Sequence, residues 1–104
     1  MTPEELEAEF VGRCVPYSGN LLLLCADDAM ALVRRAASVR VPILGVDGLF
    51  VSARSTTSPL EHIADFSSAV AKGDGCWGDA ESFITSRRQL GLSFEVVLGD
   101  RTGG

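Results

Sequence analysis

The chain is poor in several residue types that carry chemistry. It has one histidine, one tryptophan and three cysteines in 104 residues, and the cysteines, Cys14, Cys25 and Cys76, stand far apart. An odd number of widely spaced cysteines argues against a disulfide framework, so we expect free thiols, mostly buried, in a reducing compartment. The longest apolar run covers only residues 21–26, and the acidic start lacks the pattern of a signal peptide. We therefore expect a cytoplasmic protein with no membrane partner.

Basic residues are also scarce. Nine lysines and arginines face 14 aspartates and glutamates, which gives a net charge of −5 and a pI near 4.7. This balance disfavours nucleic acid and anionic lipid as partners and permits a basic protein partner. The length suits one domain over residues 1–104, with residues 99–104 as a flexible tail.

Helix signals occur in four places. Thr2 as N-cap, Pro3, and the Leu6, Phe10, Cys14 stripe predict a helix that ends before Pro16. Periodic apolar residues predict a second helix from Asp27 to about residue 40 and a last one from Trp77 to the break at Gly91. A capping pattern at residues 58–61 and the apolar residues up to Phe66 predict a helix, whose extent through residues 67–70 stays open and which stops by residues 73–75. Residues 21–25 fit either a short strand or, as we slightly prefer, a hydrophobic staple entering the second helix.

Two segments have strand character. Residues 41–51 are rich in β-branched and aromatic residues, but Asp47-Gly48 fits either a hairpin turn, which we favour for Asp47, or one long bulged strand. In residues 92–98, Leu92, Phe94 and Val96 fall on one face, and Val97 could be covered on the other. These elements predict an α+β fold, with a small antiparallel or mixed sheet covered mainly on one side by three to four helices.

Catalytic and metal-binding patterns are weak. His62 and Asp65 would share a helical face, and Cys25 or Cys76 would be the nucleophile, but no motif surrounds either thiol. The separations between Cys14, Cys25, His62 and Cys76 contain no close ligand pair. The glycines at positions 45 and 48 lack the lysine and further glycines of a phosphate loop. We expect no metal and no cofactor.

Carboxylates gather in residues 58–81, where five acidic side chains accompany the single lysine Lys72. Such a cluster could steer a basic partner toward Trp77 as an anchor, although solvated helix starts and a core tryptophan would also explain the pattern. An aspartate within an apolar strand could likewise serve a partner. The candidate partner-binding residues are Asp47, Glu61, Asp65, Trp77 and Asp79.

Four segments, residues 43–50, 58–68, 77–83 and 92–98, give the chain a family likeness. In their order and character they resemble small bacterial immunity proteins of polymorphic toxin systems. The resemblance implies a non-enzymatic α+β protein that binds and blocks a cognate toxin, with Asp47, Glu61, Asp65 and Trp77 as the matching positions nearest the surface. Two alternatives stay open: a small enzyme or ligand-binding domain that uses His62 and Asp65, and a subunit that self-associates through a sheet edge.

Overall fold

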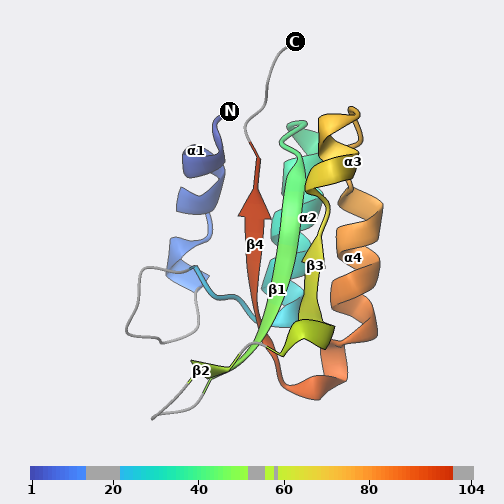
Figure 1. Ribbon diagram of the computed structural model, residues 1–104. Helices are drawn as coiled ribbons and strands as arrows, with labels where there is room; N and C mark the ends of the chain where they lie inside the picture. The colour runs from blue at the N-terminus through green and yellow to red at the C-terminus, as the bar shows by residue number, and fades with distance from the viewer. Residues whose placement is uncertain (14–21, 52–55, 58, 100–104) are drawn as a thin grey trace.

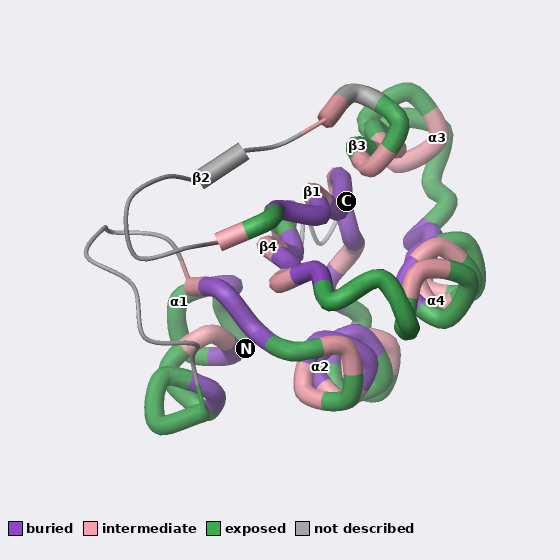
Figure 2. The backbone as a smooth tube through the Cα atoms, turned by 90° about the horizontal axis from the view of Figure 1, so that it is seen from below, coloured by how far each residue is buried: buried purple, intermediate pink, exposed green. Residues whose placement is uncertain are grey.

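The computed structural model describes residues 1–13, 22–51, 56–57 and 59–99. Four antiparallel strands form one sheet, and the helices lie mainly on one side of it (Figures 1 and 2). In chain order the elements are α1 (Pro3–Ala8), η1 (Val11–Arg13), α2 (Ala26–Ser38), β1 (Ile43–Val51), β2 (Thr56–Thr57), η2 (Leu60–His62), β3 (Ile63–Asp65), α3 (Ser67–Ala71), α4 (Trp77–Ser86), η3 (Arg88–Leu90) and β4 (Ser93–Leu98).

Strand β1 is the centre of the sheet. It pairs antiparallel with β3 and with β4, and its end also pairs with β2. Figure 2, a view along the sheet, shows α2 and α4 side by side against one face of these strands. The predicted α+β class and one-sided helical cover are confirmed.

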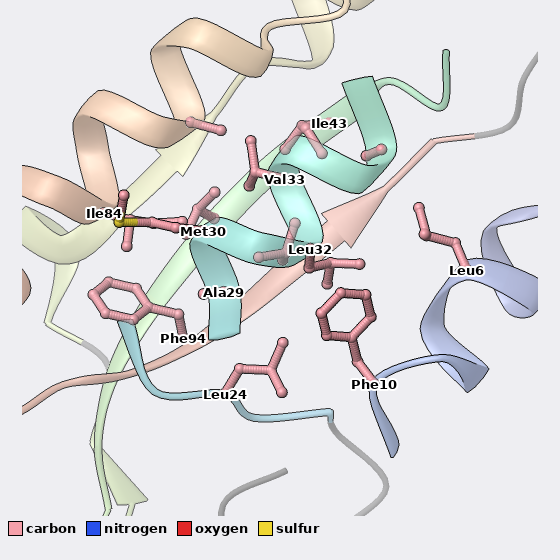
Figure 3. Packing of buried hydrophobic residues seen from close by; sticks show 14 of the residues in the cluster. Leu6, Phe10, Leu24, Ala29, Met30, Leu32, Val33, Ile43, Ile84 and Phe94 are labelled. Atoms are coloured by element: carbon pink, nitrogen blue, oxygen red, sulfur yellow. The ribbon is translucent and has the colours of Figure 1, made fainter. Parts of the chain in front are cut away.

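The core lies between that face and the helices. Val46, Phe94 and Val96 point into it from the sheet, and Val33 of α2 and Ile84 of α4 meet them there. Helix α1 adds Leu6 to the same cluster (Figure 3). Each fully buried aliphatic or aromatic side chain of this kind contributes roughly 1.5–3 kcal/mol to folding, so the helix layer supplies most of the stability.

Local signals account for several helix ends. Thr2 accepts a hydrogen bond from the Glu5 amide and Glu5 accepts one from the Thr2 amide, which is the predicted cap of α1. Helix α4 ends at Ser86, earlier than predicted, and a 3₁₀ turn, η3, continues to Gly91, which takes the left-handed conformation with φ of 73°. The first helix is shorter than predicted, because α1 ends at Ala8 and a 3₁₀ turn follows; Cys14 lies outside the described residues.

The favoured turn at Asp47-Gly48 is wrong, and the long strand is right. Asp47 pairs with Ile63 on one side and with Glu95 on the other, so it lies in the middle of the sheet. The irregularity falls earlier, where Leu44 is an extra residue between the pairs Ile43–Leu98 and Gly45–Val97. A central strand that pairs on both edges forms hydrogen bonds with more of its backbone N–H and C=O groups than a strand in a two-stranded hairpin would.

The predicted helix over residues 58–66 is also wrong. A 3₁₀ turn over Leu60–His62 leads directly into β3, and helix α3 begins only at Ser67. The predicted N-cap, Ser58, lies outside the described residues. Long-range pairing of Ala64 with Val46 has overridden the local capping pattern.

Two further expectations need correction. Leu24 exchanges backbone hydrogen bonds with Phe94 of β4, so the segment before α2 forms a β-bridge and not a helix staple.

Gly99, expected in the tail, is buried and its amide donates to the Pro42 carbonyl; residues 100–104 lie outside the described part. In the part of the chain that the structure describes, no helix has the length and apolarity needed to cross a membrane.

Candidate partner-binding face

The second face of the sheet carries a regular arrangement of side chains. Direct cross-strand pairing gives one row Asp65, Gly45, Val97 and a neighbouring row Ile63, Asp47, Glu95. Residues that pair directly in antiparallel strands point to the same side, and alternate residues point to the other. Because Val46, Phe94 and Val96 point into the helix-covered core, these two rows face away from it. We call the two rows the open sheet face.

A hollow of about 280 Å³ opens in this face. Gly45 stands at its centre and has no side chain to fill it, while the extra residue of the bulge, Leu44, forms part of the wall. A Cβ atom at position 45 would lie 2.6 Å from the Ala64 carbonyl oxygen, so the close approach of β1 and β3 requires glycine here. The hollow is lined by Leu44, Gly45, Asp47, Ile63, Ala64, Asp65, Ser67 and Val97.

Two carboxyl groups stand directly opposite each other beside the hollow. Partial burial raises the pKa of Asp47, although a hydrogen bond with Glu95 acts in the opposite direction. Partial burial also raises the pKa of Glu95, and the charges of Asp47 and Glu7 and the hydrogen bond with Asp47 raise it further. The pair therefore holds a proton more readily than isolated carboxyls do, and the two groups titrate as a coupled pair.

Helix α1 adds a third carboxyl group from the side. Partial burial raises the pKa of Glu7, and the charge of Glu4 on the same helix adds to the effect. Asp65 behaves differently, because hydrogen bonds from Ser67 lower its pKa; its Oδ1 accepts from the Ser67 amide at 2.9 Å. Asp65 thus keeps its charge at the opposite edge of the face.

Aliphatic side chains are exposed between these carboxyls. The exposed fraction is 39% for Ile63 and 36% for Val97. The expected cover over Val97 is thus incomplete. Exposed aliphatic groups set among carboxyls give this face the mixed character of a protein interface.

The structure brings together only two of the five predicted partner-binding residues. Asp47 and Asp65 both belong to the open sheet face, whereas Glu61 projects from η2 with 77% of its side chain exposed. Trp77 and Asp79 lie in the first turn of α4, outside the lining of the hollow. Trp77 packs against the core, and its Nε1 donates to the Val41 carbonyl at 2.7 Å, as expected for a structural tryptophan.

The predicted pair of His62 and Asp65 does not form on a shared helical face, because Asp65 belongs to β3. The His62 side chain is largely buried, and its Nδ1 accepts a hydrogen bond from Arg87 Nε at 3.2 Å. Arg87 also donates to the Glu61 carbonyl and stacks on Phe83 with 3.8 Å to the ring centroid. His62 therefore serves to fasten the end of α4 to η2.

One cluster of metal-ligating types occurs within the described residues. Asp74, Cys76 and Asp79 each offer one atom within 4.8 Å of the others, and none of the other predicted candidates joins them. Burial, together with the nearby charges of Asp74 and Asp79, raises the pKa of the Cys76 thiol. Asp74 Oδ1 also accepts a hydrogen bond from the Cys76 amide at 2.8 Å, so a local turn before α4 accounts for the closeness of these two residues.

Sequence analysis missed Glu7, Glu95 and the exposed Val97 as site residues. Glu95 alternates with Phe94 and Val96 in the same way that Asp47 interrupts an apolar strand. That similarity was a usable signal, but only the register of β1 with β4 shows that the two carboxyls meet.

Comparisons with protein-family models, with curated proteins and with solved structures find no significant match to this chain.

Proposed function

We propose that this protein is a binding protein of the immunity type, which neutralises a cognate bacterial toxin in the cytoplasm by covering a basic surface of it. The open sheet face is the binding surface. The observation that carries the proposal is the placement of Asp47 directly opposite Glu95, half-buried, on the side of the sheet that faces away from the helix-covered core. Like charges in this position destabilise a sheet by roughly 0.2–1 kcal/mol, and positions that break a local rule in this way are often functional ones.

The mechanism needs no covalent step. Carboxylates on one face attract a basic partner during diffusion and raise the association rate, and exposed aliphatic side chains then provide apolar contact area. Because the helix layer forms its own core on the other side of the sheet, the open face is already folded before the partner arrives. A preformed surface loses little conformational entropy on binding.

The alternative of a small enzyme is less well supported by the site. The contacts of His62 with Arg87 and of Asp65 with Ser67 hold the two candidate groups in separate structural roles. The proposed function therefore assigns His62 to stability and Asp65 to the binding face.

The gene neighbourhood is sequenced first, and co-expression with the product of an adjacent toxin-like reading frame then tests the proposal; the absence of any such frame counts against it. We expect the wild type to restore growth and the double variant Asp47→Lys with Glu95→Lys to lose at least ten-fold in plating efficiency, because a basic partner is then repelled. The matched control, Asp27→Lys with Glu81→Lys, makes the same charge change on helices of the opposite layer and should still protect. Equal protection by both double variants would exclude the open sheet face as the inhibitory surface.

A further inference from the structure

We infer that the hollow over Gly45 is a socket for one arginine side chain of the protein partner. This inference rests on the proposed function and specifies the chemistry of the contact. The occupant follows from three features of the hollow, namely its size, its apolar wall and the placement of its carboxyls.

The size of the hollow fits a side chain better than a metabolite. Its volume is about 280 Å³ and it is open to solvent. Pockets for drug-sized ligands take roughly 300–1,000 Å³ and enclose most of the ligand surface. A single long side chain that enters from a partner's surface needs no such enclosure.

The wall provides an apolar stretch next to a charged one. Leu44, Ile63 and Val97 line the hollow around Gly45, and the exposed parts of Ile63 and Val97 are available to the methylene groups of a long side chain. Asp47 and Asp65 reach the hollow from neighbouring rows, and Glu95 stands beside Asp47. A side chain with an aliphatic stem and a cationic end could place its stem against the apolar wall and its charge beside the carboxyl groups.

Arginine fits the carboxyl arrangement better than lysine does. Its planar guanidinium carries five N–H donors and can bond two carboxylates in one plane, whereas the lysine ammonium is a compact and strongly hydrated charge. A bare metal ion is a poorer occupant, because within the described residues no group of three potential ligands includes Asp47, Asp65 or Glu95.

Charge neutralisation makes the socket sensitive to protons. Glu7 from α1 is the further charged group that acts on the Asp47–Glu95 pair, and Asp65 of β3 lies in the neighbouring row of the same face, so no cation is among the groups that shift the pKa of either carboxyl within the described residues. An incoming guanidinium would supply the missing positive charge and displace the shared proton. Binding should therefore release a proton and become stronger as the pH rises through the range in which the pair titrates.

An NMR titration tests the socket with a defined probe. Isotope-labelled full-length protein is titrated with N-acetyl-arginine amide, with N-acetyl-lysine amide and with N-acetyl-citrulline amide, which is the uncharged isostere of the arginine probe. We expect saturable shifts centred on Gly45, Ile63 and Val97 for the arginine probe, with a dissociation constant on the order of 10 mM at low salt. The citrulline probe should bind at least ten-fold more weakly, and the lysine probe should lie between them.

Variants separate the socket from general attraction to an acidic protein. The double variant Asp47→Asn with Glu95→Gln should weaken binding of the arginine probe at least five-fold. Ile63→Ser, at an exposed position that spares the fold, should weaken it two- to three-fold through loss of the apolar wall. Glu61→Gln, which neutralises an exposed carboxylate away from the hollow, should leave the dissociation constant within a factor of two.

Three results would overturn the socket: no saturable shift at the hollow, equal binding of the citrulline probe, or shifts centred on Glu61 or Asp79. Each of them leaves the proposed function to the co-expression experiment, in which loss of protection by the open-face variant would still identify the binding surface.

Discussion

Asp47 and Glu95 are the residues at which the proposed binding role conflicts most directly with stability. Their raised pKa values mean that the folded protein holds the shared proton more tightly than the unfolded chain does. Their contribution to stability is therefore complete below the ordinary carboxyl pKa and is lost as the pH rises through the folded-state values. At neutral pH the pair destabilises the native sheet.

Removing one charge of the pair should make the protein more stable at neutral pH. We expect Glu95→Gln to raise the free energy of unfolding by about 0.5 kcal/mol at pH 7, as is typical for relief of a cross-strand like-charge pair. Below pH 4 the gain should disappear, because Glu95 is then protonated in both states. Urea denaturation at the two pH values measures the difference, with Glu61→Gln as the exposed control; a variant less stable than wild type at pH 7 would contradict this account.

Gly45 is the residue that keeps the hollow open. A methyl group at this position would meet the Ala64 carbonyl oxygen, which belongs to the backbone and cannot turn away. We expect Gly45→Ala to cost about 1–3 kcal/mol of stability through displacement of β3 from β1. Thermal or urea unfolding gives the value.

Gly78 in the first turn of α4 provides a matched control, because a Cβ there meets no atom within 4 Å. Gly78→Ala should stabilise the protein by about 0.5 kcal/mol through its higher helix propensity. If both alanine variants had the same stability, the close approach at Gly45 would not be the reason for that glycine.

Among the elements, the end of α4 and the turn η2 are joined mainly through Arg87. Its guanidinium contacts His62 Nδ1, the Glu61 carbonyl and the ring of Phe83. We expect His62→Ala to lower the free energy of unfolding by about 1 kcal/mol, since it removes one charge-assisted hydrogen bond and leaves the others in place. The same variant should protect as well as wild type in co-expression; loss of protection with the fold intact would favour the enzyme hypothesis.

Elements with strong local signals were predictable from the sequence. The periodic apolar residues of α2 and the capping residues Thr2 and Glu5 of α1 predicted helices that the structure contains. The strand β4 was equally clear, because Phe94 and Val96 alternate with polar neighbours. In each case the decisive residues lie within one element, so no distant partner had to be known.

Elements that depend on distant partners were not predictable. Residues 63–65 form a strand only because β1 accepts them, and local propensity favoured a helix there. The same dependence explains why Asp47-Gly48 resembled a turn: the two neighbours of β1 lie many residues away. For the site, the sequence singled out Asp47 and Asp65 but could not pair Asp47 with Glu95 before the register was known.

At the scale of the whole molecule, the hydrophobic core and the proposed binding surface lie on opposite sides of one sheet. The helix side buries Phe94 and its partners in a continuous core (Figure 3). On the other side Asp65, Ile63 and Val97 are exposed, and Asp47 and Glu95 are half-buried. Substitutions of side chains that are exposed on this face, such as Ile63→Ser, should therefore have little effect on folding, because an antiparallel sheet can have one solvated face, whereas Gly45 is fixed by the close approach of β1 and β3.

Electrostatic steering by the open sheet face gives the central claim a kinetic test. Stopped-flow mixing of the purified protein with the neighbouring toxin-like domain measures the association rate constant as a function of ionic strength. We expect this constant to fall at least ten-fold between about 20 and 300 mM salt, and Asp47→Asn with Glu95→Gln to slow association at low salt and to flatten the dependence. An association rate constant that changes neither with salt nor with the two substitutions, or no association at all, would contradict the account.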